Sequence, residues 1–262
     1  MTALLEVRDL EVTVPGRSGE VRAVRGLSFE VRPGEVLAIV GESGAGKTLT
    51  VQAVLGLLGS AAVVRGSVRF DGQELAGASQ SSYRGLRGRR LGFVPQDALS
   101  VLSPIHRVGD QLAIAVRSVQ GGGRKAAWDV AVRALDQVGI PDAGRRARAY
   151  PHEFSGGMRQ RAVIAMAMIN EPELIFADEP TTALDPRIQA QILALLTRLR
   201  DESGTAVVLV THDLAAVAGS ADRVLIMQAG REAESGPVDR VLSAPRSPYT
   251  AGLIASLREL YR

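Results

Sequence analysis

The sequence predicts an α/β fold with a mostly parallel sheet, an antiparallel β part near the N-terminus and an inserted helical segment. Residues 36–40, 174–177 and 206–210 are apolar throughout, which is typical of strands that are covered on both faces. Residues 186–200, between the last two strands, repeat apolar side chains at helical spacing. This strand-helix-strand pattern favours parallel strands. In contrast, residues 104–168 have the pattern of helices alone.

The N-terminal part predicts a β-hairpin that is followed by a strand, a loop and a helix. Residues 5–14 and 21–31 alternate apolar and polar side chains, and the turn-forming sequence PGRSG joins them at 15–19. After a turn at Pro33 and Gly34, the strand at 36–40 leads into a glycine-rich loop. A helix is expected over residues 47–58.

The middle of the chain predicts a helical subdomain. Apolar side chains from Ala127 to Val138 recur at helical spacing after three consecutive glycines at 121–123. We therefore expect a single domain over residues 1–262, with an α/β core at 1–95 and 169–235. The helical subdomain is expected at 96–168, and a helical tail at 236–262.

Composition restricts the class of protein. The 262 residues are 46% hydrophobic and 23% charged, as in ordinary globular proteins. No apolar run approaches the ~20 residues of a membrane-spanning helix, and Glu6, Arg8 and Asp9 stand where a signal peptide would be apolar. The absence of cysteine excludes disulfides and thiolate metal sites and fits a reducing compartment, so a cytoplasmic location is expected.

The charge pattern does not indicate nucleic-acid binding. The formal net charge is only +3. The basic stretches at 84–90 and 145–148 lack the interleaved aromatic residues on which single-strand binders stack bases. We interpret them as solvated faces.

Residues 41–48 read GESGAGKT and match the phosphate-loop pattern G-x-x-x-x-G-K-[ST] between a buried strand and a helix. Glycines let the backbone wrap a polyphosphate, the helix N-terminus supplies N–H donors, Lys47 adds a cation and Thr48 offers a hydroxyl to Mg²⁺. The expected nucleotide-binding residues here are Gly41, Glu42, Ser43, Gly44, Ala45, Gly46, Lys47, Thr48 and Thr50.

Two adjacent carboxylates follow the apolar strand at 174–177, at the strand end where open α/β sheets bind ligands. Asp178 is expected to hold the Mg²⁺ shell, and Glu179 to polarise an attacking water. In isolation the pair could equally be an acidic turn. The phosphate loop elsewhere in the chain favours the catalytic interpretation.

Ser155, Gly156 and Gly157 open a helix that is expected to continue through Ala167. Serine is a common N-cap, but two glycines in a first turn cost up to ~1 kcal/mol each relative to alanine. Close approach of an anion to the helix N-terminus is the physical reason we favour.

These segments together resemble the ATP-binding subunit of ABC transporters, over essentially the whole chain and in the family's order. The resemblance implies a P-loop NTPase core, with ATP and Mg²⁺ as its ligands. It identifies residues 154–161, FSGGMRQR, as the signature and residues 183–185, ALD, as the D-loop. It also identifies Gln96 in FVPQD as the Q-loop glutamine and His212 as the switch histidine. Asp185 before Pro186 also has a plainer interpretation, as a helix N-cap.

The resemblance assigns roles to these residues. Those implied to be catalytic are Glu179, His212 and Gln96. Those implied to bind the metal are Thr48, Gln96 and Asp178. In a head-to-tail dimer, the nucleotide of one chain is completed by the signature residues of the other, which are Ser155, Gly156 and Gly157.

Within the family, the chain is similar to ATPases of oligopeptide, dipeptide and nickel importers. The implied partners are permease subunits in the membrane and a second ATPase, which Met158 in the signature suggests is a different chain. A substrate-binding protein is an indirect partner, and the implied location is the cytoplasmic face of the membrane, as a peripheral subunit. The chain has no cysteine-bearing tail, and in this respect it is nearer to the short nickel or metallophore members. Ser103, before Pro104, stands where the family usually has asparagine.

Two further points stay open at the level of sequence. The alternative class is a soluble ABC ATPase that acts on DNA or ribosomes, although the chain shows neither a long coiled-coil insertion nor a second ATPase half. The second point is the adenine. The family usually presents an aromatic residue at the end of the first strand, where this chain has Val14, with Arg17 and Arg22 as the nearby guanidinium groups.

Overall fold

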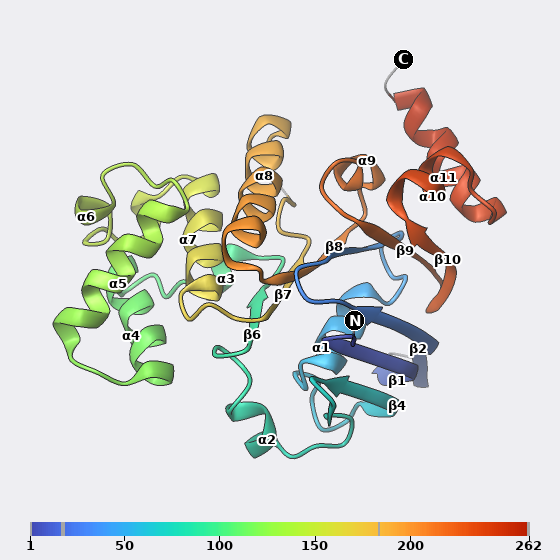
Figure 1. Ribbon diagram of the computed structural model, residues 1–262, viewed down its shortest axis with the longest axis horizontal. Helices are drawn as coiled ribbons and strands as arrows, with labels where there is room; N and C mark the ends of the chain where they lie inside the picture. The colour runs from blue at the N-terminus through green and yellow to red at the C-terminus, as the bar shows by residue number, and fades with distance from the viewer. Residues whose placement is uncertain (1, 17–18, 183, 261–262) are drawn as a thin grey trace. The chain divides into compact units, whose positions relative to one another are not determined.

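A computed structural model describes residues 2–16, 19–182 and 184–260. The chain divides into two compact units (Figure 1). The first unit contains Met1–Gly85 and Ala206–Arg262, and the second contains Leu86–Thr205.

The first unit contains an antiparallel sheet in the order β2-β1-β4-β5. Its strands are β1 (Leu5–Gly16), β2 (Gly19–Val31), β4 (Val63–Phe70) and β5 (Gln73–Glu74). The predicted hairpin of β1 and β2 is confirmed, but its pairing continues to Gly16 and Gly19. The backbones of the two strands therefore pair beyond the residues whose alternating side chains predicted the hairpin.

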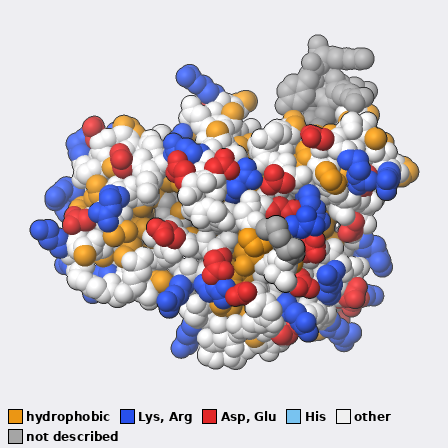
Figure 2. Space-filling model, viewed as in Figure 1, with side chains coloured by type: hydrophobic (Ala, Val, Ile, Leu, Met, Phe, Trp, Pro, Cys, Tyr) orange, Lys and Arg blue, Asp and Glu red, His pale blue; other side chains and the backbone are white. Residues whose placement is uncertain are grey.

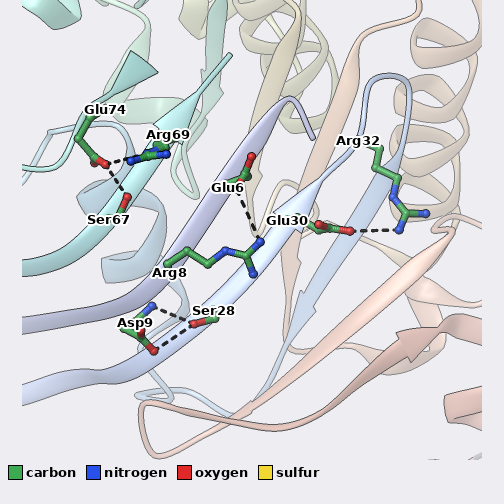
Figure 3. A network of polar contacts seen from close by, with 9 residues as sticks. All are labelled: Glu6, Arg8, Asp9, Ser28, Glu30, Arg32, Ser67, Arg69 and Glu74. Atoms are coloured by element: carbon green, nitrogen blue, oxygen red, sulfur yellow. Dashed lines mark hydrogen bonds and ion pairs between the residues drawn. The ribbon is translucent and has the colours of Figure 1, made fainter. Parts of the chain in front are cut away.

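One face of this sheet is apolar and the other is charged. Leu5, Val7 and Val12 are fully buried, whereas Figure 3 shows ion pairs such as Glu6 with Arg8 on the exposed side. Exposed pairs of this kind contribute only about 0–1 kcal/mol each. The buried face therefore supplies most of the stability of the sheet.

The other strands of the first unit form a second sheet segment in which β9, β3 and β8 are parallel and β10 is antiparallel to β9. They are β3 (Val36–Val40), β8 (Ala206–Thr211), β9 (Arg223–Gln228) and β10 (Arg231–Pro237). Every residue of β3 and β8 is buried, as their apolar sequences predict. The helices of this unit are α1 (Lys47–Val54), α2 (Gln80–Arg84), α9 (Leu214–Val217), α10 (Val238–Ser243) and α11 (Pro248–Leu260).

Helix α1 is shorter than the 47–58 that the sequence predicts. It ends at Val54, and Gly56 has a φ of 60°. The Leu57 N–H group then donates to the Gln52 carbonyl across 2.8 Å. A glycine in the left-handed region is the commonest way to end a helix, so Gly56 stops a run whose apolar pattern continues.

The second unit combines two parallel strands with helices. The strands β6 (Leu91–Val94) and β7 (Leu174–Asp178) pair from Leu91 and Leu174 to Val94 and Ala177. The helices are α3 (Ala98–Val101), α4 (Val108–Gln120), α5 (Arg124–Gln137), α6 (Ala143–Arg146), η1 (Pro151–Glu153), α7 (Gly156–Met168) and α8 (Pro186–Ser203). Helix α5 packs against both α4 and α7 (Figure 1).

The surface is of ordinary globular character. Basic and acidic side chains are interspersed on the face drawn in Figure 2. In the part of the chain that the structure describes, no helix combines the length and the apolarity needed to cross a bilayer.

Candidate functional site

The phosphate loop, residues 41–48, lies in the first unit between β3 and α1. Gly46 has a φ of 99°, and a Cβ at this position would lie 2.4 Å from the Ala23 carbonyl oxygen. A Cβ on Gly41 would lie 2.4 Å from the Met227 carbonyl oxygen. Both glycines are therefore required by backbone that passes close to the loop, while Glu42 and Ser43 are exposed.

Helix α1 begins without a capping side chain among the described residues. The N-cap residue is Gly46, and the first turn contains no acidic residue. The first N–H groups of a helix have no partner within the helix and carry a partial positive charge. This end of α1 is therefore suited to an anion.

The ammonium group of Lys47 lies on the backbone of its own loop. It donates to the carbonyl oxygens of Gly41 at 2.7 Å and Glu42 at 3.0 Å, and the residue is only 5% exposed. Thr48 lies beside it at the start of α1 and is partly buried. The positive charge is therefore already held at the loop by neutral carbonyl groups.

Thr50 is fully buried, and its hydroxyl donates to the Gly46 carbonyl across 2.9 Å. This bond supports the last turn of the phosphate loop from within α1. A direct contact between Thr50 and a nucleotide stays a prediction.

His212 is an exposed residue between two anchored neighbours of the first unit. The Asp213 N–H group donates to the Thr211 hydroxyl across 3.0 Å. The Asp213 carboxylate in turn accepts the Ala215 N–H group at the start of α9 across 2.8 Å. The turn after β8 therefore fixes the backbone on both sides of His212.

Val14, at the predicted adenine position, is partly buried in β1 and pairs with Val21 of β2. It lines a cavity of about 310 Å³ at the end of the hairpin, together with residues such as Thr13 and Val63. The guanidinium of Arg22 binds the Glu11 carboxylate across 2.8 Å, so it is already engaged. Arg17 lies outside the described residues.

Asp178 and Glu179 lie at the carboxyl end of β7 in the second unit. All five residues of β7 are buried, and Asp178 is 2% exposed. Glu179 has a φ of 45°, a conformation that non-glycine residues rarely adopt. Backbone strain of this kind costs of the order of 1–3 kcal/mol and clusters at functional sites.

The second unit brings two predicted catalytic residues into direct contact. The side-chain amide of Gln96 donates to Glu179 Oε2 across 3.2 Å, and the Thr182 hydroxyl donates to the same oxygen across 2.9 Å. Gln96 follows β6 and Glu179 follows β7, and these strands pair in parallel. Thr182 was not predicted as a site residue, and its place three residues after Glu179 is the only signal in the sequence.

The signature segment, residues 154–161, begins helix α7 as predicted. Ser155 is the N-cap, and its hydroxyl oxygen accepts the Met158 N–H group across 3.3 Å. A Cβ on Gly157 would lie 3.0 Å from Ile188 Cγ2, whereas the nearest described atom to a Cβ on Gly156 is Leu184 Cδ2 at 3.6 Å. Packing against described residues therefore accounts for part of the need for glycine at Gly157 and gives no such reason at Gly156.

The D-loop segment precedes α8, and Ala183 lies outside the described residues. The Asp185 carboxylate accepts the Ile188 N–H group across 3.1 Å, with Pro186 as the first helical residue. The plainer interpretation of Asp185 as an N-cap is therefore confirmed. An N-cap role for Asp185 is compatible with the D-loop role that the resemblance implies.

Sequence reasoning missed Gln111, which holds the loop before α4. Its side-chain oxygen accepts the Ser103 N–H group across 2.8 Å, and its amide donates to the carbonyls of Ser103 and His106. Ile105 within this loop is 77% exposed. Gln111 therefore orders a loop that presents an apolar side chain to solvent.

The predicted site residues are divided between the two units. The first unit holds the phosphate loop and His212, and the second holds Gln96, Asp178, Glu179 and the signature segment.

Comparison with known proteins gives one family. A family model described as ABC transporter matches residues 24–182. The oligopeptide transport ATP-binding protein OppD of Mycobacterium tuberculosis is 51% identical over 261 residues, which are 99% of this chain and 43% of that protein. The dipeptide transport ATP-binding protein DppD of Bacillus subtilis is 47% identical over 99% of this chain and 78% of its own length. The chain thus spans less than half of the mycobacterial relative.

Two solved structures are similar to this chain. The dimeric ATP-binding cassette MJ0796 bound to ADP and phosphate superposes with a TM-score of 0.79, at 25% identity, over 89% of this chain and 98% of its own. The cbiO1 protein of Clostridium perfringens, part of an ABC transporter complex, has a TM-score of 0.78 at 26% identity, over 93% of this chain and 92% of its own. The expected α/β fold is confirmed.

Proposed function

The chain belongs to the ABC transporter family, and on that premise we propose that it is an ATP-hydrolysing subunit that powers import of peptides through a membrane permease. The observation that carries the proposal is the phosphate loop at the uncapped N-terminus of α1, with Lys47 held at the loop. A loop of this kind is suited to a nucleoside triphosphate.

The proposed substrate is ATP with Mg²⁺. The N–H groups of the loop and Lys47 contact the phosphates, while oxygen atoms of Thr48, Gln96 and Asp178 are proposed as metal ligands. Hydroxyl, amide and carboxylate oxygens are the donors that Mg²⁺ prefers, so the donor set fits the ion.

In the proposed reaction, a water oxygen forms a bond to the γ-phosphorus as the bond from that phosphorus to the bridging oxygen of ADP breaks. Glu179 orients and polarises this water, and the proton that the water loses passes to the carboxylate. Gln96 and Thr182, which both donate to Glu179 Oε2, orient the carboxylate. His212 is proposed to contact the γ-phosphate.

The signature segment is proposed to act on the nucleotide of a second ATPase chain in a head-to-tail dimer. No described residue packs closely enough to require glycine at Gly156, which supports the approach of an anion from another chain. The dimeric form of the similar cassette MJ0796 also supports it. Because of Met158, the second chain is proposed to be a non-identical ATPase.

The permease is proposed to dock at the loop that Gln111 orders. Ile105 there is 77% exposed and Ile114 of α4 is 59% exposed, although large apolar side chains are usually buried. Docking places the chain at the cytoplasmic face of the membrane as a peripheral subunit. A binding protein that delivers cargo is an indirect partner.

The names of the two relatives favour peptides over nickel as cargo, and favour transport over action on DNA or ribosomes. Import then depends on coupling between hydrolysis and movement of the permease.

Two measurements test the proposal. The purified chain should bind MgATP, and Lys47→Ala should weaken this binding while the circular dichroism spectrum is unchanged. Vesicles that contain the permease and both ATPases should take up peptide only with ATP, and Ile105→Glu should prevent co-purification with the permease. Failure of the folded wild-type chain to bind MgATP would overturn the proposal.

A further inference from the structure

The N-terminus of helix α4 is bonded to backbone from another part of the second unit. Its N-cap residue is Arg107, which is not one of the usual capping residues. The Val108 N–H group donates to the Ala149 carbonyl across 3.0 Å, and the Gly109 N–H group donates to the Ala147 carbonyl across 2.8 Å. The first N–H groups of a helix have no partner within the helix. These two bonds therefore supply partners that the helix itself cannot provide.

Close packing accompanies the two bonds. A Cβ on Gly109 would lie 2.8 Å from the Ala147 carbonyl oxygen and 2.9 Å from Trp128 Cη2. Val108 and Ala147 are fully buried. A side chain larger than hydrogen at residue 109 would therefore push the start of α4 away from the backbone that it contacts.

Residues 147–153, here called the linking segment, run from this contact to the signature segment. The Pro151 carbonyl of the linking segment accepts the Phe154 N–H group across 3.1 Å and Arg159 Nε across 2.7 Å. Both donors belong to the signature segment, in which Ser155 is the N-cap of α7. The linking segment is therefore bonded to α4 at one end and to the signature segment at the other.

The loop that Gln111 orders leads directly into these bonds. It comprises residues 103–107, and the Gln111 side chain holds its backbone at Ser103 and His106. Val108 is the next residue of the chain. The loop, the start of α4 and the linking segment thus form one continuous hydrogen-bonded structure within the second unit.

We propose that Val108 is a positioning residue, whose backbone N–H group holds the linking segment and thereby places the signature segment relative to the 103–107 loop. This inference rests on the proposed function, in which the permease docks at that loop and the signature segment acts on the nucleotide of a second ATPase. Coupling between sites is carried by contiguous hydrogen bonds and packed elements. A permease that moves the loop then moves the signature segment with it.

The alternative is that the start of α4 matters only because its buried side chains fill the core of the second unit. Val108→Pro removes the N–H group, whereas Val108→Ala keeps the N–H group and removes side-chain volume. Proline is common at the first position of a helix. Arg107 has the extended conformation that a residue before proline favours, with φ −64° and ψ 144°. The two variants therefore separate the hydrogen bond from the packing.

A second pair of variants does not depend on proline. Gly109→Ala places a methyl group against the Ala147 carbonyl and should force the same contact apart. Gly144→Ala is its matched control, because Gly144 also lies in a helix, α6, and no described atom lies within 4 Å of a Cβ built there. If Val108→Pro fails to fold, this second pair tests the proposal by itself.

The experiment uses the full chain, alone and assembled with the permease and the second ATPase. Circular dichroism and the emission of Trp128, the only tryptophan in the sequence, verify folding. MgATP affinity is measured on the chain alone. Co-purification with the permease and permease-stimulated ATP hydrolysis are measured on the assembly.

The two variants that disturb the contact should lose stimulation and keep binding. A single hydrogen bond corresponds to about two- to tenfold. Val108→Pro and Gly109→Ala should reduce permease-stimulated hydrolysis by about this factor, with unchanged MgATP affinity and unchanged co-purification. Val108→Ala and Gly144→Ala should keep most of the stimulation, even if the melting temperature of Val108→Ala falls.

Three results would overturn the positioning role. The first is full stimulation in the folded Val108→Pro chain or, where that chain does not fold, in Gly109→Ala. The second is an equal loss in Val108→Ala or Gly144→Ala, because packing or general stability would then account for the effect. The third is loss of co-purification, since the bond would then serve docking and not the signature segment. Failure of the wild-type chain to bind MgATP is a different result, which overturns the proposed function and this role with it.

Discussion

The side-chain amide of Gln96 donates a hydrogen bond to the carboxylate of Glu179 across 3.2 Å, although 83 residues separate them in the chain. Each residue lies two positions beyond a paired strand residue, Val94 in β6 and Ala177 in β7. Parallel pairing in this register places the two side chains at the same sheet edge. In the proposed reaction, this bond orients the carboxylate that acts as the general base.

Replacing Glu179 by glutamine should abolish most turnover without preventing nucleotide binding. The amide cannot accept a proton, and general-base catalysis contributes about 10²- to 10⁴-fold in rate. ATP affinity and steady-state hydrolysis should be measured on the assembled transporter. Thr182→Val serves as the control, since it removes a donor to Glu179 but keeps the carboxylate, and it should lose far less activity. Normal turnover in Glu179→Gln would remove this residue from the base role.

The isolated chain is expected to be a poor ATPase. In the proposed dimer, Ser155, Gly156 and Gly157 act on the nucleotide of the partner, so a monomer lacks part of each site. ATPase activity should rise when the second ATPase and the permease are added, and Gly156→Val should reduce the activity of the assembly. A monomer, verified by light scattering, that hydrolyses ATP as fast as the full transporter would contradict the composite site.

Much of the fold could be predicted because the strongest signals are local. The apolar runs at 36–40 and 206–210 and the N-cap sequence before α8 depend only on neighbouring residues. The strands β4, β5, β6, β9 and β10 were not predicted. Alternate residues of β4, such as Val63 and Arg65, are exposed, and five of the seven residues of β10 are charged, polar or glycine.

The phosphate loop and the carboxylates were predicted from their spacing, because phosphate chemistry constrains consecutive residues. The contacts of Gln111 with Ser103 and the packing of Tyr249 against the apolar cluster that includes Val40 could not be predicted in the same way. Glutamine and tyrosine serve many purposes, and the packing that brings Tyr249 to Val40 joins segments about two hundred residues apart. Such pairs are set by tertiary structure.

Glu234→Gln should destabilise the first unit in a pH-dependent way. Burial alone would raise the pKa of Glu234, but the N–H groups of Ser247 and Arg246 hold it below its usual value. A lowered carboxyl pKa gives stability that is complete above the usual pKa of about 4.3 and is lost as the pH falls through the lower native pKa.

Urea unfolding should therefore show Glu234→Gln to be about 1.5–3 kcal/mol less stable at pH 7, the range for hydrogen bonds to a charged group. The difference should shrink as the pH falls through the lowered native pKa, where the wild-type carboxylate becomes protonated as well. Glu232→Gln, at an exposed position of the same strand, should change stability by less than about 0.5 kcal/mol. A difference that stays constant or grows in acid would contradict this account of Glu234.

Val14→Tyr should create a stacking platform for adenine that the wild type lacks. Val14 is partly buried at the end of the hairpin and lines the cavity of about 310 Å³, while Arg22 is engaged with Glu11. With apolar contact alone, the base adds little to affinity, which then depends mainly on the triphosphate and Mg²⁺. The wild type is therefore expected to discriminate weakly between ATP and GTP.

An aromatic pair contributes about 0.5–1.5 kcal/mol beyond the area it buries, so Val14→Tyr should tighten ATP binding by about 2- to 12-fold. Val14→Leu enlarges the apolar contact without an aromatic face and should gain little, which makes it the matched control. Calorimetric titration of ATP and GTP against the wild type, Val14→Tyr and Val14→Leu tests this prediction. A strong preference for ATP in the wild type, with no gain of ATP affinity in Val14→Tyr, would contradict this prediction. Adenine would then already be bound by other residues, and a new ring would add no further affinity.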